Sequence, residues 1–364
     1  MRFQNIQVLR AITALVVVSI HLSNYGEHTF GASGWLIDLL RLPGLESACV
    51  PFFFAISGFV LAHALQNTPP GRFLFARYLR IYPGYLVAVG LTLLAVWFTW
   101  WPAEYRTYCK PAAIGFSLLP RTPGTFVFVL GVEWSLVYEM VLYVALSAMA
   151  LFGVRRGVPV LATVWLTVLL AKAYLRPGYA NDVFPVWATV WLSSFIIPFW
   201  LGLLAYYVRD RGRRWRWVIG AGLVAFVAKV PWMARHQEQA WLAWGVAAVV
   251  AVWFAAAVRQ LPQRNVLVWF GDRTYGLYLV HVPVTLTTFY LLRDRGWLVG
   301  TTAGVAVTGV VVLVLGALYG DLECRLHNRF RPLTKLDVRG WLGRTRGRLV
   351  RWTGGVRSRN QTPA

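Results

Sequence analysis

An arginine and a histidine stand eleven residues apart in the first apolar segment, LRAITALVVVSIHLSNYG, at Arg10 and His21. An ideal α-helix turns about 100° per residue, so eleven residues return almost to the starting azimuth after a rise of roughly 16 Å. Both side chains are therefore predicted to share one face of an otherwise apolar helix. Ionisable groups inside a membrane helix are costly and usually functional. Histidine suits proton transfer near neutral pH, so His21 is the candidate general base.

A small polar residue follows in the next apolar segment, VPFFFAISGFVLAHAL, where Ser57 and Gly58 stand among large aromatic residues. Small residues let helix backbones approach closely, so packing is the expected role of this pair. Ser57 is also a candidate nucleophile, although no G-x-S-x-G context surrounds it.

Two arginines then occur in the segment RYLRIYP, which we expect to be a loop at the inner membrane surface. Arg77 and Arg80 are three residues apart and would point the same way at a helix start. Paired guanidinium groups suit a bidentate grip on phosphate. The positive-inside rule also explains the charge, but it does not explain the flanking aromatic residues and Pro83. Arg77, Arg80 and Arg10 are therefore candidate ligands for an anionic substrate.

A stripe of polar residues is predicted in the segment EWSLVYEMVLY. Ser135, Glu139 and Tyr143 recur every four residues and would lie on one face of a helix. The Glu139 carboxylate needs a partner inside a membrane, and we expect an arginine or histidine of another helix. Trp134 is closer to the interface, where an aromatic belt would explain it.

A second stripe is predicted in the segment FGDRTYGLYLVH and the residues after it. Thr274, Tyr278, His281 and Thr285 share a helical face. Phenol, hydroxyl and imidazole groups on one stripe can line a wet channel or form a hydrogen-bond network. The sequence leaves a catalytic and a purely structural network equally open.

The elements that must position these groups are membrane helices. Of the 364 residues, 58% are hydrophobic, and the mean hydropathy is +0.55. The apolar runs are about 20 residues long, which is enough to cross a hydrocarbon core. We predict an all-α polytopic membrane protein with about ten transmembrane helices. The expected spans are 8–22, 49–65, 82–101, 131–153, 158–174, 186–208, 217–233, 239–258, 266–292 and 298–319.

The net charge of +22 is distributed as in a membrane protein rather than a nucleic-acid-binding protein. Loops on one side hold about 25 Lys and Arg, against about 8 on the other, which is the positive-inside pattern. Both termini are therefore expected in the cytoplasm. Residues 1–320 would form the membrane domain and residues 321–364 a basic tail. The tail is either a helix lying on anionic lipid or a disordered segment.

The three cysteines do not have metal-like spacing. Cys49 and Cys109 are both expected near the outer face, where a disulfide can form. Two unrelated free thiols are the alternative.

Five of these segments, taken in order, resemble the acyltransferase-3 family, the bacterial membrane acyltransferases of the O-antigen O-acetylase type. The matching pieces are Arg10 with His21, FFFAISGF, RYLRIYP, EWSLVYEMVLY and TYGLYLVH. Each piece is weak alone, but five in the family's order are specific, and they cover most of the membrane domain.

The resemblance implies O-acyl transfer, O-acetylation being expected, from cytoplasmic acyl-CoA to a hydroxyl of a sugar, glycan, lipid or secondary metabolite. Arg77 and Arg80 match the family's RxxR motif, which is thought to hold the donor's phosphates, and His21 matches its catalytic histidine. The expected location is the cytoplasmic membrane of a bacterium, with membrane lipids as neighbours and modification of cell-envelope carbohydrate as one role.

Direct transfer would use His21 as general base and would need neither a metal nor a covalent intermediate. Tyr278, Trp134 or an arginine would stabilise the oxyanion, and Glu139 is a further catalytic candidate. The main alternative is a polytopic transporter of a small polar solute or an acylated product, although no convincing internal repeat is visible. An acyltransferase by ancestry that has lost its activity is a third possibility.

Overall fold

The computed structural model describes residues 3–42, 45, 47–98, 101, 117–121, 129–176, 178–181, 183, 185–209, 237–294 and 299–335. Within these ranges the chain is helical and contains no strand; the β pairing there is an isolated bridge between Arg121 and Val186. The α-helices are α1 (Gln4–Phe30), α2 (Trp35–Arg41), α3 (Cys49–Leu65), α4 (Pro70–Phe98), α6 (Glu133–Met149), α7 (Gly157–Leu175), α8 (Ile197–Val208), α10 (Gln237–Ala257), α11 (Val266–Asp294) and α12 (Thr302–Phe330).

Long apolar helices dominate the described part of the chain, as an all-α polytopic membrane protein requires. Six of them are long and apolar enough to cross a membrane, and three shorter apolar helices cover 49–65, 194–208 and 241–257. Nine predicted spans therefore correspond to a described helix, which confirms the predicted fold class. The predicted span 217–233 lies outside the described residues.

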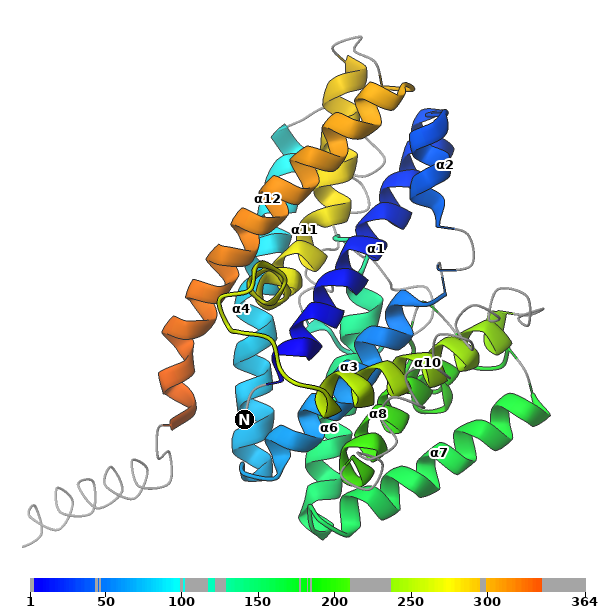
Figure 1. Ribbon diagram of the computed structural model, residues 1–364, viewed down its shortest axis with the longest axis vertical. Helices are drawn as coiled ribbons and strands as arrows, with labels where there is room; N and C mark the ends of the chain where they lie inside the picture. Colours follow the sequence, from blue (N-terminus) through cyan, green and yellow to red (C-terminus); the bar gives the residue numbers. More distant parts are fainter. Residues whose placement is uncertain are drawn as a thin grey trace, which may run out of the picture.

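Two sets of helices pack side by side (Figure 1). In one set, α11 packs against both α1 and α12, and α4 contacts α11 and α12. In the other, α3 packs against α8 and α10, and α7 lies against α8. The two sets are joined where α1 contacts α3, and α6, which contacts α4 of the first set and α7 of the second, lies between them. Polar groups from both sets can therefore meet at this junction.

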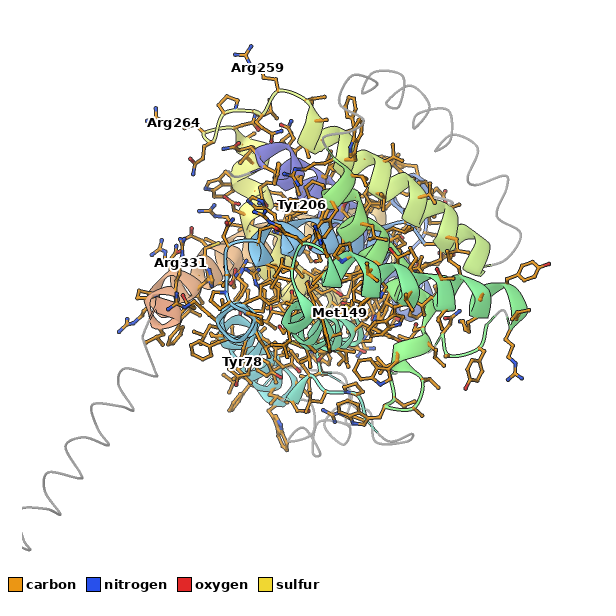
Figure 2. The ribbon with its side chains drawn as sticks, turned by 90° about the horizontal axis from the view of Figure 1, so that it is seen from below. Tyr78, Met149, Tyr206, Arg259, Arg264 and Arg331 are labelled. Carbon is orange, nitrogen blue, oxygen red and sulfur yellow. The ribbon has the colours of Figure 1, made fainter. Side chains whose placement is uncertain are left out.

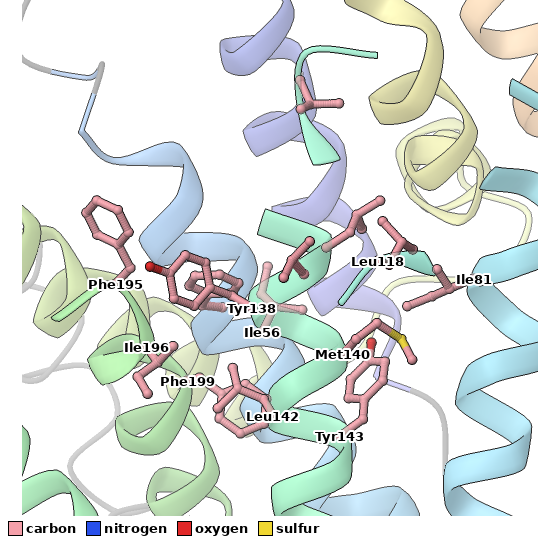
Figure 3. Close-up of a cluster of buried hydrophobic side chains, with 14 of the residues drawn as sticks. Ile56, Ile81, Leu118, Tyr138, Met140, Leu142, Tyr143, Phe195, Ile196 and Phe199 are labelled. Carbon is pink, nitrogen blue, oxygen red and sulfur yellow. The ribbon is translucent and has the colours of Figure 1, made fainter. Parts of the chain in front are cut away.

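The position of α6 is fixed by its apolar side chains. Figure 3 shows Tyr138 and Leu142 of α6 in one cluster with Ile56 of α3, Ile196 and Phe199. All five side chains are buried. Because these apolar groups face α3 and α8, the polar stripe of α6 is left to face the space between α3 and α11.

Helix α4 begins at Pro70, so Arg77 and Arg80 lie on a helix and not in the predicted loop. Pro83 lies within this helix, where it removes one backbone donor without ending the helix. Membrane helices tolerate such a proline because neighbouring groups satisfy the freed carbonyl. The loop prediction was wrong because the helix begins twelve residues before the start of the expected span at residue 82.

Two other boundaries differ from the sequence prediction. The expected span 186–208 contains short 3₁₀ turns at Val190–Leu192 and Ser194–Ile196, and α8 begins only at Ile197. Ser193 has an extended backbone there, and Pro198 occupies the first turn of α8, where proline is favoured. Helix α12 continues to Phe330, ten residues beyond the expected domain boundary at 320. Residues 336–364, and with them most of the predicted tail helix, lie outside the described residues.

Candidate active site

A cavity lies between α1, α3, α6 and α11, where the two sets of helices meet. It has a volume of about 540 Å³, counting its open mouth. Its polar lining includes six residues that the sequence singled out, namely Arg10, Ser57, Ser135, Glu139, Thr274 and Tyr278. The four helices are far apart in sequence, so the fold brings predicted site residues from separate segments into one space.

Three arginines gather at the end of this cavity where α1 begins. Arg10 lines the cavity, and its charge acts on both Arg77 and Arg80. The Nε atoms of Arg10 and Arg77 are buried and have no hydrogen-bond partner within the described part of the chain. Guanidinium groups that are close together, with donors left over, favour an anionic ligand.

Arg80 differs from the other two arginines because its charge is already compensated. It forms an ion pair with Glu323 of α12, and its guanidinium lies over the ring of Tyr275, 5.1 Å from the ring centroid. Arg77 instead lies over the ring of Phe73, at 5.6 Å. Of the two arginines in the motif, Arg77 is the one whose buried Nε has no hydrogen-bond partner among the described residues.

The Glu139 carboxylate is held by hydroxyl groups. Ser57 Oγ of α3 donates a hydrogen bond to Glu139 Oε1 at 2.8 Å, and the Tyr143 hydroxyl also bonds to this carboxylate. Arg77 interacts with Glu139 electrostatically. The arginine partner expected from the sequence therefore acts on Glu139 by charge, while the hydrogen bonds to Glu139 come from Ser57 and Tyr143.

A hydroxyl pair joins α6 to α11 higher in the cavity. Ser135 Oγ and the Tyr278 hydroxyl are 2.7 Å apart, and the Tyr278 hydroxyl donates to the Val132 carbonyl oxygen at 3.0 Å. Either hydroxyl can be the donor within this pair, because Ser135 Oγ is also 3.4 Å from the Val132 carbonyl oxygen and each hydroxyl has one proton. The Glu133 carboxylate fixes this turn by accepting from the backbone N–H groups of Val132 and Leu130. In either arrangement the Tyr278 proton is already used, so Tyr278 must give up a hydrogen bond to Val132 or Ser135 before it can donate to an oxyanion.

The two histidines form a pair one turn beyond Tyr278. His21 Nδ1 and His281 Nε2 are 3.0 Å apart, and the ring centroids are 4.9 Å apart. His281 Nδ1 is 2.7 Å from the Tyr278 carbonyl oxygen. His21 is half-buried and does not line the cavity, but it faces α11 and stacks with Tyr25 at 6.2 Å. The predicted base therefore points towards the interior of the bundle.

Trp134 lies apart from this arrangement. Its ring packs against Tyr138 and Phe195, with centroids 6.3 and 5.5 Å away, and it does not line the cavity. Cys109 lies outside the described residues, so its predicted bridge to Cys49 does too. Among the described residues, no three His, Cys, Asp or Glu side chains are grouped so that they could hold a metal ion.

Comparison with known proteins agrees with the order of these segments. The sequence profile of the family described as "Acyltransferase domain", acyltransferase-3, matches residues 3–319. The chain belongs to the acyltransferase-3 family. The match spans α1 through most of α12 and includes every residue that lines the cavity.

A relative of this acyltransferase-3 chain is "Protein 2 in picA locus" from Rhizobium radiobacter. The two are 38% identical over 103 residues, which is 27% of this chain and 46% of the relative. The chain thus spans about half the length of this relative. No solved structure matches the chain.

Sequence reasoning missed two residues of this acyltransferase-3 site. Glu323 was assigned to the tail because the last span was expected to end near residue 319. Tyr275, which lines the cavity and lies under Arg80, falls between two residues of the predicted stripe. Glu323 could have been noticed as an acidic residue in a segment dominated by arginine.

Proposed function

We propose that this protein is a membrane O-acyltransferase that moves an acyl group, most simply acetyl, from cytoplasmic acyl-CoA to a hydroxyl acceptor. The observation that carries the proposal is the cavity that extends from Arg10 to Tyr278, with the arginines at one end and the histidine pair beyond the other. Acceptors of this chemistry are sugars, glycans, lipids and secondary metabolites. The bacterial cytoplasmic membrane is the corresponding location.

The donor would bind with its phosphates at the arginine end. Figure 2 looks onto one end of the helix bundle, where Arg259, Arg264 and Arg331 extend from its rim. The positive-inside rule identifies such a face as cytoplasmic, which is the side on which acyl-CoA is available. Arg77 and Arg10, with unused donors, are the proposed phosphate ligands, and the pantetheine arm would follow the cavity towards Tyr278.

His21 is the proposed general base. The acceptor hydroxyl attacks the thioester carbonyl while His21 takes the hydroxyl proton, and the C–S bond then breaks. The proton passes to the departing thiolate, so coenzyme A leaves as the free thiol. Tyr278 is a proposed donor to the oxyanion, after it exchanges its present hydrogen bond to Val132 or Ser135. Glu139 would keep Ser57 and Tyr143 oriented along the donor's path.

The proposal is tested by replacing His21 in the full-length protein in lipid nanodiscs. Radiolabelled acetyl-CoA is supplied with bacterial envelope extract, and acylated products are identified by mass spectrometry. His21→Ala should lower transfer by at least about 100-fold, the smallest usual contribution of a positioned base. The control is His28→Gln, at an exposed histidine in the last turn of α1, which should leave transfer unchanged. Near wild-type transfer by His21→Ala would refute the assignment.

Two assays of the full-length protein, one in nanodiscs and one in vesicles, separate an enzyme from the transporter considered above. Thioester cleavage coupled to an acylated product marks the enzyme. For the transporter, the same protein is reconstituted in closed vesicles. Movement of solute across the vesicle membrane without any acyl turnover would mark a transporter instead.

A further inference from the structure

His281 is the most deeply buried ionisable group near the proposed base. Its side chain is fully buried, and it reaches His21 of α1 from α11. Each imidazole has two ring nitrogens, and the hydrogen bond made by one decides whether the other can donate or accept a proton. The contacts of His281 therefore determine what His21 can do.

The tautomer of His281 follows from its partners. Its Nδ1 faces the Tyr278 carbonyl oxygen at 2.7 Å, and the Leu277 carbonyl is also a backbone partner. Carbonyl oxygens only accept hydrogen bonds, so Nδ1 of His281 carries the proton. In the neutral ring, Nε2 of His281 is then an acceptor.

A positively charged His281 would donate a hydrogen bond from Nε2 to His21 instead of accepting one, but the surroundings do not support a cation. In the described part of the chain, no hydrogen bond or ion pair joins either imidazole to a carboxylate. The titratable groups in contact with the pair are the phenols of Tyr25 and Tyr278. An unpaired charge that is fully buried is far more costly than a neutral ring with both nitrogens satisfied.

The geometry assigns His281 as a positioning residue that fixes His21 in the tautomer with the proton on Nδ1. His281 Nε2 accepts that proton at 3.0 Å, and the Val17 backbone, one turn earlier, is the second hydrogen-bond partner of the His21 ring. With the proton on Nδ1, His21 Nε2 keeps its lone pair for the acceptor hydroxyl. A neutral imidazole free in water favours the opposite tautomer, with the proton on Nε2, which cannot act as a base at that atom. This inference rests on the proposed function of His21 as the base.

Two substitutions separate the hydrogen bond from the bulk of the ring. In His281→Gln the amide oxygen reaches the place of Nε2 and still accepts from His21. In His281→Leu the volume is similar, but the acceptor is gone. A role in packing alone would not distinguish these two variants.

The tautomer is measured directly by ¹⁵N NMR of the full-length protein in nanodiscs with labelled histidine. The chain has six histidines, and the His21 signals are identified by their loss in His21→Gln. We expect a protonated Nδ1 and a bare Nε2 on His21 in the wild type and in His281→Gln, and a shift towards protonated Nε2 in His281→Leu. A His21 protonated on Nε2 in the wild type would overturn the inference.

Transfer from acetyl-CoA gives the second readout. His281→Leu should lower kcat about 10- to 100-fold and leave the KM for acetyl-CoA unchanged, whereas His281→Gln should stay within a few-fold of the wild type. If His21→Ala is inactive but His281→Leu has a normal kcat, the positioning role is refuted and the proposed function stands. If His21→Ala is active, the proposed function fails whatever the NMR spectra show.

Discussion

Arg80 of α4 and Glu323 of α12 form an ion pair in which only 1% of the carboxylate side chain is exposed. The residues are 243 positions apart in the sequence. Arg80 also lies over Tyr275 of α11, so this contact joins three helices at the end of the bundle where the arginines gather. Within the group of Arg10, Arg77 and Arg80, the two whose buried Nε has no hydrogen-bond partner in the described part of the chain are Arg10 and Arg77.

Removing Glu323 should destabilise the protein strongly, because Arg80 would remain charged with no counter-ion. Breaking a buried pair by deleting one partner costs about 3–5 kcal/mol. Glu323→Ala should therefore lower the thermal midpoint of the full-length protein in detergent, followed by intrinsic tryptophan fluorescence.

The matched control for this change is Asp321→Ala. Asp321 also pairs with arginines, Arg273 and Arg325, but its side chain is 29% exposed. Solvent screens such pairs, so the control should shift the midpoint little. Equal shifts of the thermal midpoint in the two variants would show that the Arg80–Glu323 pair stabilises the protein no more than the exposed pairs of Asp321 do.

Helical periodicity predicted which residues share a face, but not which faces meet. A spacing of four residues places side chains on one side of any helix, and Ser135 and Glu139 of the predicted stripe line the cavity, whereas Tyr143, the third residue of the stripe, does not. The partner of Glu139 on another helix was not predictable, because it depends on the packing of α6 against α3. Glu139 bonds to the Ser57 hydroxyl of α3 and to Tyr143 of its own helix, not to the basic residue that local reasoning favoured.

The position of Glu323 shows a second limit of the sequence. Hydropathy falls after residue 319, so the span was ended there, yet α12 continues to Phe330. The carboxylate is tolerated at this depth because Arg80 lies opposite it, and only the tertiary structure reveals that pairing. The membrane fold and the family were predictable because they depend on composition and motif order, and both can be read from the sequence without knowledge of tertiary contacts.

Replacing Arg77 should weaken donor binding specifically. Its Nε is buried without a partner, and it is the arginine of the motif that Glu323 does not neutralise. A charge-assisted hydrogen bond contributes about 1.5–3 kcal/mol. Arg77→Gln should therefore raise the Kd for coenzyme A about 10- to 100-fold, measured by isothermal titration calorimetry in nanodiscs.

Arg72 provides the control for charge alone. It lies on the same helix five residues earlier and is exposed, so Arg72→Gln removes the same charge from the same face of the membrane. We expect the Kd of Arg72→Gln for coenzyme A to change less than about three-fold, since exposed charges are screened by salt. Similar losses in both variants would indicate that coenzyme A responds to the overall charge of this face and not to a site at Arg77.

Close packing of α3 against α8 should be essential for both stability and the site. A Cβ atom added to Gly58 would overlap the Phe199 carbonyl oxygen, so Gly58→Ala forces the two helices apart. Overpacking of this kind costs about 1–3 kcal/mol. Because Ser57 is the next residue and bonds to Glu139, the displacement should also reduce acyl transfer.

Gly90→Ala is the matched substitution in α4, where an added Cβ atom meets nothing within 4 Å. Alanine is the better helix former, so this variant should be unchanged or more stable by up to about 1 kcal/mol. Thermal midpoints and transfer rates of the two variants, measured side by side, decide the matter. If Gly58→Ala matched Gly90→Ala in both, the contact between α3 and α8 would not be what holds Ser57 against Glu139, and the small size of Gly58 would not be required.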